Sequence, residues 1–149
     1  MSFKEEVYAA FFVLLNNKIN LLQKVLFDLH ESAKNETKST AGDKHETALA
    51  MLQIEQENIR RQLRETQQQK TIFDGIDPLL SHAEIRKGSL IKTNKNWFFI
   101  SAGVGKIKHE DIIIIALSPL SPLGLKLMGK RLNEHIMMNA AEYKIESIE

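Results

Sequence analysis

A heptad pattern of apolar residues constrains this chain more than any other feature of its sequence. A repeat of about 3.5 residues is typical of a helix that packs along one side against another helix. The pattern alternates steps of four and three through the first part of the chain: Tyr8, Phe12, Leu15, Ile19, Leu22, Leu26 and Leu29. It predicts a helix from about Phe3 to about His30.

A second heptad pattern follows and predicts a helix from just after Asp43 to about Phe73. Its members are Leu49, Leu52, Gln56, Ile59, Leu63, Thr66 and Phe73, with Lys70 at the remaining position. The polar and small residues 31–42 between the two patterns predict a loop. Two helices joined in this way fold back as an antiparallel hairpin. With arms of roughly 27 residues, the hairpin would be about 40 Å long.

The first predicted helix carries a second apolar stripe beside the heptad positions. The stripe consists of Val7, Phe11, Leu14, Leu21 and Val25. It is wider than a two-helix contact needs, and exposed apolar patches usually mark a contact surface. Two interpretations remain open: the base of the hairpin packs on the rest of the chain, or helix one forms a homodimer.

The hairpin is predicted to end in a short stretch of helix-stopping residues, Asp74 to Pro78. Gly75 suits a left-handed cap at the end of a helix, and Pro78 cannot continue one. We therefore expect an N-terminal hairpin over residues 1–75, with its tip at about residues 31–46, and a second domain over residues 79–149.

In the second domain the hydrophobic pattern changes to short runs rich in β-forming residues. The predicted strands are Leu90-Ile91, Trp97–Ile100, Ile112–Ala116, His135–Met138 and Tyr143–Ile148. Ser121, Pro122 and Gly129 carry the cap signals of one short helix. Gly103–Lys106 lacks the spacing of a phosphate-binding loop and is interpreted as a turn. The predicted fold class is α+β, a helical hairpin followed by a small, mostly antiparallel sheet with one helix.

Composition and charge exclude several classes of protein. The 149 residues include no cysteine, which excludes disulfides and thiolate metal sites. The net charge of +1 argues against strong nonspecific nucleic-acid binding by the whole chain. The apolar stretch Val7–Leu15 is far shorter than the roughly 20 residues of a membrane span and lacks the flanks of a signal peptide. We expect a cytoplasmic protein with no membrane association.

Asp43 and Glu46 are the first candidate functional residues. Three residues apart at a helix start, their carboxylates could share a Mg²⁺ ion, which prefers oxygen ligands and retains several waters. The same Asp-x-x-Glu pattern is typical of a capping box, in which each side chain accepts a backbone N–H at the helix start. The two interpretations are compatible, and both remain open.

A basic cluster and five histidines complete the candidates. Arg60, Arg61 and Arg64 on helix two could contact a phosphate backbone, or form a solvated face in which Glu57 pairs with Arg61. The histidines, at positions 30, 45, 82, 109 and 135, show no metal-ligand spacing, and 109–111 is interpreted as a charged loop. No nucleophile–base pair stands out, so the chain is not predicted to be an enzyme.

Two segments together resemble the GreA/GreB family of bacterial transcript cleavage factors. Gly42-Asp43-Lys44-His45-Glu46-Thr47-Ala48 resembles the family's Gly-Asp-x-x-Glu-Asn-Ala hairpin tip. The segment 117–130 is similar to the family's Ser-Pro … Gly-Lys segment. The positions that agree there are Ser121, Pro122, Leu127, Met128, Gly129 and Lys130. The order of the two domains also agrees.

The resemblance implies an FKBP-like C-terminal domain that docks at the secondary channel of RNA polymerase, with Ser121, Pro122, Gly129 and Lys130 in the docking segment. It implies a coiled coil that reaches down the channel. Asp43 and Glu46 would help hold a second Mg²⁺ at the polymerase's own active site, where the metal activates water to cut backtracked nascent RNA. The polymerase, not this chain, would be the enzyme.

The chain departs from the family pattern at the tip. Thr47 stands where the family has Asn, 48–51 lacks the aromatic residue that follows, and Lys34, Lys38 and Lys44 surround the acids. Two alternatives therefore remain: a regulator that binds the channel without stimulating cleavage, and a coiled-coil interaction protein with a different partner. Prolyl isomerase activity does not follow from an FKBP-like shape.

Overall fold

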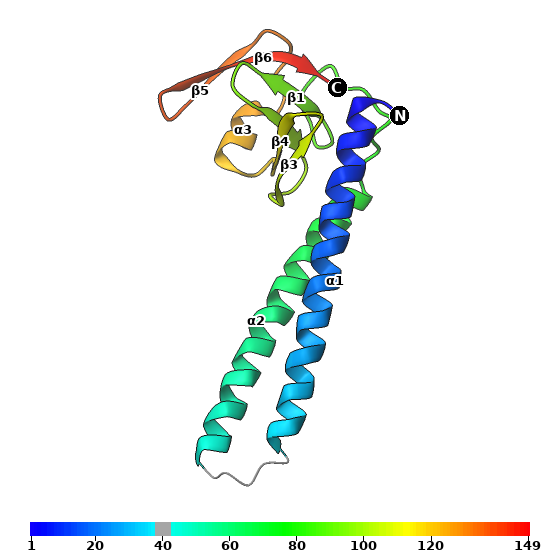
Figure 1. The fold of residues 1–149 in the computed structure, drawn as a ribbon. Helices are drawn as coiled ribbons and strands as arrows, with labels where there is room; N and C mark the ends of the chain where they lie inside the picture. Colours follow the sequence, from blue (N-terminus) through cyan, green and yellow to red (C-terminus); the bar gives the residue numbers. More distant parts are fainter. Residues whose placement is uncertain (38–42) are drawn as a thin grey trace. The chain divides into compact units, whose positions relative to one another are not determined.

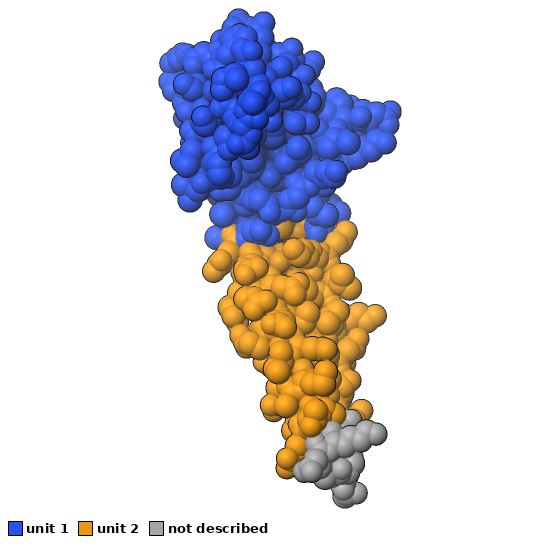
Figure 2. All heavy atoms as spheres, turned by 90° about the vertical axis from the view of Figure 1, so that its left-hand side faces the viewer, with its two compact units in different colours: residues 1–14, 69–149 blue, residues 15–68 orange. Residues whose placement is uncertain are grey.

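The computed structural model describes the backbone of residues 1–37 and 43–149, and the side chains of residues 1–35 and 46–149. The chain forms two compact units. The first, unit 1, combines Met1–Leu14 with Gln69–Glu149, and the second, unit 2, is Leu15–Gln68 (Figure 2).

Unit 2 is a two-helix hairpin, as the heptad patterns predict. It is built from the greater parts of α1 (Phe3–Thr37) and α2 (Asp43–Asp74), which lie side by side in opposite directions (Figure 1). Leu15 and Leu22 of the first heptad pattern are buried. Two polar heptad residues of α2, Gln56 and Thr66, are buried as well.

Both polar residues have hydrogen-bond partners in the hairpin. Gln56 Nε2 donates to the carbonyl oxygen of Leu29 in α1 (3.4 Å), and Thr66 Oγ1 donates to the carbonyl oxygen of Gln62 one turn earlier (2.8 Å). Burying a polar group is costly unless it is paired, so these bonds explain how the seam accepts polar side chains.

The predicted loop 31–42 is wrong over its first part, because α1 continues to Thr37 instead of ending at about His30. The segment contains no glycine or proline before Gly42, so nothing in it stops a helix. Glu31 and Lys34 also form an ion pair across one helical turn (3.4 Å). Residues 38–42, the rest of that loop, lie outside the described part of the chain.

Unit 1 has an aromatic core where the first turns of α1 meet the last turn of α2 and the sheet. Phe11, Phe73 and Phe99 are fully buried, with ring centroids 5.8–5.9 Å apart. Tyr8 Oη donates to the carbonyl oxygen of Phe73 (2.6 Å). The base of the hairpin thus packs on the rest of the chain, one of the two interpretations of the apolar stripe.

The sheet of unit 1 has six strands in the order β3-β4-β2-β1-β6-β5. Only the β2–β4 pair is parallel; the other neighbours are antiparallel, as predicted. The strands are β1 Leu90–Thr93, β2 Trp97–Ile100, β3 Gly105–His109, β4 Ile112–Leu117, β5 His135–Met138 and β6 Ala141–Ile148, and the helix α3 is Pro122–Leu127. The predicted α+β class is confirmed.

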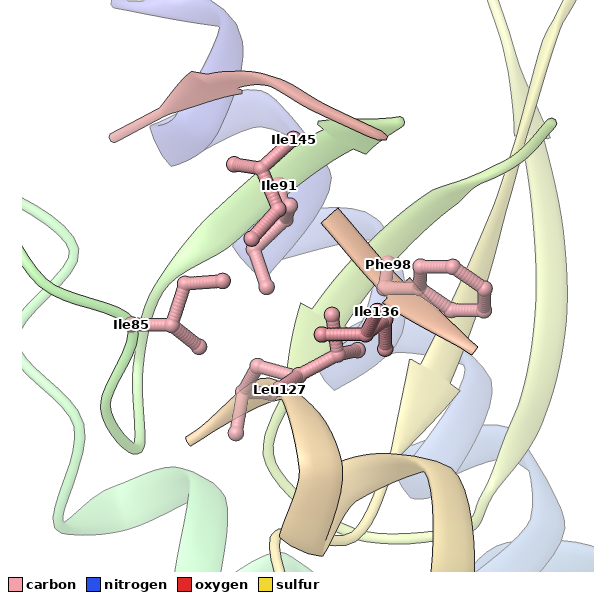
Figure 3. Packing of buried hydrophobic residues seen from close by; sticks show 7 residues of the cluster. Ile85, Ile91, Phe98, Leu127, Ile136 and Ile145 are labelled. Atoms are coloured by element: carbon pink, nitrogen blue, oxygen red, sulfur yellow. The ribbon is translucent and has the colours of Figure 1, made fainter. Parts of the chain in front are cut away.

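A second core, shown in Figure 3, lies between the sheet and α3. Successive residues of a strand face opposite sides of the sheet, so Phe99 reaches the aromatic core while its neighbours reach this one. The buried members are Ile85, Ile91, Phe98, Ile100, Leu127, Ile136 and Ile145. The sheet is therefore covered on both faces.

The turn predicted at Gly103–Lys106 is wrong in its second half, because Gly105 and Lys106 begin strand β3. Within β3 only Ile107 is a large apolar residue, flanked by Lys106 and Lys108. The strand lies at an edge of the sheet, where charged side chains are common because they hinder pairing with other chains. An edge strand of this kind lacks the apolar run that identifies an inner strand.

Candidate functional site

The candidate tip acids lie at the start of α2. Asp43 is the first residue of that helix, and its side chain is outside the described residues. Glu46, in the first helical turn, has an exposed side chain. A helix start offers free backbone N–H groups to an acid. Metal binding and capping by these two residues both stay predictions.

Near this end of unit 2 the two helices leave a hollow of about 280 Å³. Lys34 and His30 of α1 and Leu49 and Gln53 of α2 line it. Lys34 is one of the lysines that depart from the family's tip pattern, and it is held beside Glu31. At this position the pairing partly offsets its positive charge.

The basic cluster is exposed, and two of its three arginines, Arg60 and Arg64, pair with residues of their own helix. Arg64 Nη2 pairs with Glu57 Oε1 at 3.3 Å, and Arg60 Nη2 donates to Gln56 Oε1 at 3.2 Å. The predicted pairing of Glu57 with Arg61 is wrong, because Glu57 pairs with Arg64 instead. Glu57 and Arg64 are seven residues apart, so they lie on the same side of the helix, two turns from each other. Nucleic-acid contact by Arg60, Arg61 and Arg64 remains a prediction.

The predicted docking segment builds the start of α3. Ser121 is the N-cap: its Oγ accepts the N–H of Gly124 (3.1 Å) and donates to the carbonyl oxygen of Ser118 (2.7 Å). Pro122 occupies the first turn, where its missing N–H costs nothing. The predicted short helix with its serine cap is thus confirmed.

The end of the segment is hydrogen-bonded to Ile85, which precedes β1. Gly129 has φ of +80°, a conformation that favours glycine, and its N–H donates to the carbonyl oxygen of Ile85 (2.8 Å). The N–H of Ile85 in turn donates to the carbonyl oxygen of Lys130 (2.9 Å). Ser121, Pro122 and Gly129 therefore have structural reasons for their presence, whatever else they contact.

Exposed apolar residues that sequence reasoning missed lie beside this segment. A hollow of about 390 Å³ lies between α3 and β5, and Leu125, Lys126, Lys130 and Met137 are among the residues that line it. Leu125 and Met137 are 61% and 54% exposed, so apolar surface and two lysines adjoin. The alternation within β5 was the available signal, because Met137 follows the buried Ile136.

One serine–histidine pair is present that the sequence did not predict. His82 Nδ1 and Ser89 Oγ are 2.7 Å apart. Ser89 is fully buried and its Oγ also accepts the N–H of Arg86, which braces the turn before β1. Burial, helped by the charges of Lys4 and Arg86, lowers the pKa of His82 below its ordinary 6.5. A hydroxyl enclosed in this way is a structural element, not a nucleophile.

The geometry defines an α+β protein in which a long helical hairpin precedes a small sheet domain. Within the described residues, no helix has the length and apolar character needed to cross a membrane.

No protein-family model matches the chain, and no curated protein matches it. Among solved structures, that of the transcription factor Gfh1 aligns over 92% of this chain and 92% of its own, with 12% identity and a TM-score of 0.37.

Proposed function

We propose that this protein is a Gre-type accessory factor of RNA polymerase. It binds the polymerase through the sheet domain and presents the end of its helical hairpin to the active site. The observation that carries the proposal is an Asp-x-x-Glu pair in the first turn of α2, the second helix of a two-helix hairpin. The Ser-Pro … Gly-Lys segment in the second domain supports it independently.

In this role Asp43 and Glu46 supply oxygen ligands to a Mg²⁺ ion that they share with the polymerase. Two-metal hydrolysis of a phosphodiester needs one metal to activate the attacking water and one to stabilise the leaving oxygen. A factor that helps to hold one of those metals accelerates cleavage without containing an active site of its own. The chain's part is to position two carboxylates.

The hollow between α3 and β5 is the surface we assign to docking. Leu125 and Met137 provide exposed apolar area, and Lys126 and Lys130 provide positive charge. Interfaces commonly combine an apolar centre with a polar rim. Ser121 and Gly129 act indirectly, because they fix the helix and turn that carry these side chains.

The test is RNA cleavage in a stalled, backtracked complex of the cognate polymerase, with and without this protein. We expect acceleration that falls at least about a hundredfold in Asp43→Asn/Glu46→Gln, since metal stabilisation of such a transition state is worth several kcal/mol. Polymerase affinity should stay unchanged. Asp28→Asn/Glu55→Gln is the matched control, because it removes two exposed acids elsewhere on the hairpin, one on α1 and one on α2.

Other outcomes identify the alternatives. Binding without acceleration would indicate a channel-binding regulator. Asp43 and Glu46 would then serve only as a helix cap. Failure to bind polymerase, with an unchanged circular dichroism spectrum, would favour a coiled-coil interaction protein with another partner.

A further inference from the structure

Three metal-ligating side chains from distant parts of the sequence come together in unit 1. Glu6 belongs to α1, His109 ends β3, and Glu110 begins the turn to β4. Each offers one ligand atom, and these atoms all lie within 4.8 Å of one another. In the described part of the chain this is the only such group of three. We propose that Glu6, His109 and Glu110 form a binding site for Zn²⁺.

The turn and the ring packing around the cluster position the backbone of Glu110 and the imidazole of His109. Glu110 and Asp111 both have positive φ, +50° and +64°, as in a two-residue type I′ turn between antiparallel strands. The ring of Phe3 lies 5.8 Å from that of His109 and 5.3 Å from that of Trp97, so the imidazole is packed against Phe3, which itself packs on Trp97. The orientation of His109 is therefore set before any ligand binds.

The distances suit tetrahedral coordination. Two ligands of Zn²⁺, each about 2.0–2.1 Å from the metal, are about 3.3 Å apart at the tetrahedral angle. Glu6 Oε2 and His109 Nε2 are already 3.2 Å apart. The exposed Glu110 carboxylate closes the remaining gap by rotation of its side chain. Three protein ligands then leave the fourth position to water.

The donor set distinguishes among metals. Imidazole nitrogen suits Zn²⁺ and its neighbours, whereas Mg²⁺ prefers a shell of oxygen ligands and water. An open hollow of about 380 Å³, lined in part by Glu110, Phe3 and Trp97, adjoins the cluster at Glu110. This site is separate from the proposed Mg²⁺ site at the hairpin tip and does not depend on it.

A simple surface ion pair is the competing interpretation, and the chain contains a matched example of one. His135 Nδ1 and Glu142 Oε1 are 2.8 Å apart across β5 and β6. No third ligand joins them in the described residues. If Glu6 and His109 were only such a pair, the two histidines would respond alike to zinc.

The experiment is calorimetric titration of the full chain with ZnCl₂, together with thermal unfolding with and without Zn²⁺. We expect one Zn²⁺ per chain and a raised melting temperature, because an ion that binds only the folded state stabilises it. His109→Gln and Glu6→Gln should each weaken binding at least about tenfold and remove the thermal shift. His135→Gln and Asp43→Asn/Glu46→Gln should leave both unchanged.

Imidazole ¹⁵N NMR of the unaltered protein gives a readout that needs no variant. One equivalent of Zn²⁺ should shift the His109 nitrogens and leave those of His135 in place, while MgCl₂ shifts neither. The proposal is overturned by an absence of zinc binding, by affinity that survives His109→Gln, or by a response centred on His135.

Discussion

At the scale of single residues, Gly124 in α3 leaves the least room for a side chain among the glycines that the structure describes. It is buried, and a Cβ added there would lie 2.0 Å from the carbonyl oxygen of Ser118 and 2.8 Å from Ser121 Oγ. The first neighbour is backbone and cannot rotate away. The same serine hydroxyl caps the helix through the Gly124 N–H.

Gly124→Ala should therefore lower the free energy of unfolding by about 3 kcal/mol or more, at the upper end of overpacking effects. Urea titration followed by circular dichroism measures it. Gly103→Ala is the control: nothing lies within 4 Å of its added Cβ, and its φ is not in the left-handed region. That change should stay within about 0.5 kcal/mol. Equal effects of the two substitutions would show that the backbone around Gly124 can move to make room for a side chain.

At the scale of elements, the aromatic core joins three parts of the chain that are far apart in sequence. Phe11 comes from α1, Phe73 from α2 and Phe99 from β2, and all three rings are fully buried. The ring planes of Phe73 and Phe99 are inclined by 29° and those of Phe11 and Phe99 by 22°. The arrangement is offset stacking, which adds to the stabilisation from buried area.

Phe73→Ala should cost about 3–5 kcal/mol of unfolding free energy, because it leaves a cavity among the other rings. Chemical denaturation checks this value. Phe27→Ala, at a ring that is 63% exposed on the same kind of helix, should cost less than about 1 kcal/mol. A loss below about 1.5 kcal/mol for Phe73→Ala would mean that the core around it collapses to fill the space.

The elements that could be predicted are those that a local pattern determines. The heptad pattern that contains Leu15 and Leu22 and the cap residues of α3 each depend on spacings within a few residues. The structure confirms the predicted helices in both cases. Strand β3 was missed because an edge strand need bury little, so its Ile107 stands alone. The end of α1 was misplaced because polar composition suggested a loop where no residue breaks a helix.

The candidate sites also divide into one that a local pattern predicts and others that only the fold brings together. The acid pair at Asp43 and Glu46 could be proposed from its spacing, since both residues lie in one helical turn. The cluster of Glu6 with His109 could not, because 103 residues separate them and only the packing of α1 beside the β3–β4 turn unites them. Leu125 and Met137 likewise become one surface only through the fold.

At the scale of the whole molecule, the two units differ in how much they bury. Unit 1 contains most of the buried residues in the described part of the chain, whereas the seam of unit 2 includes the polar Gln56 and Thr66. Burial of apolar area is the main source of stability. The two units should therefore open at different free energies, as cooperative parts of a protein often do.

Hydrogen exchange under native conditions should reveal this difference. Backbone amides of Phe98, Phe99 and Ile114 should exchange at least about tenfold more slowly than those of helix residues 19–29, corresponding to an opening free energy about 1.4 kcal/mol higher. NMR or mass spectrometry resolves the two sets. Equal protection of residues 19–29 and of Phe98, Phe99 and Ile114 would contradict the division and indicate one cooperative structure.

The aromatic core also has a consequence for synthesis on the ribosome. Phe11 is translated about 90 residues before its stacking partner Phe99, an interval of roughly 4–18 s at usual rates. During that interval the nascent α1 exposes Val7 and Phe11, which are fully buried in the finished protein. Chaperones bind exposed apolar segments of this kind, so α1 is the part of this chain that we expect them to protect.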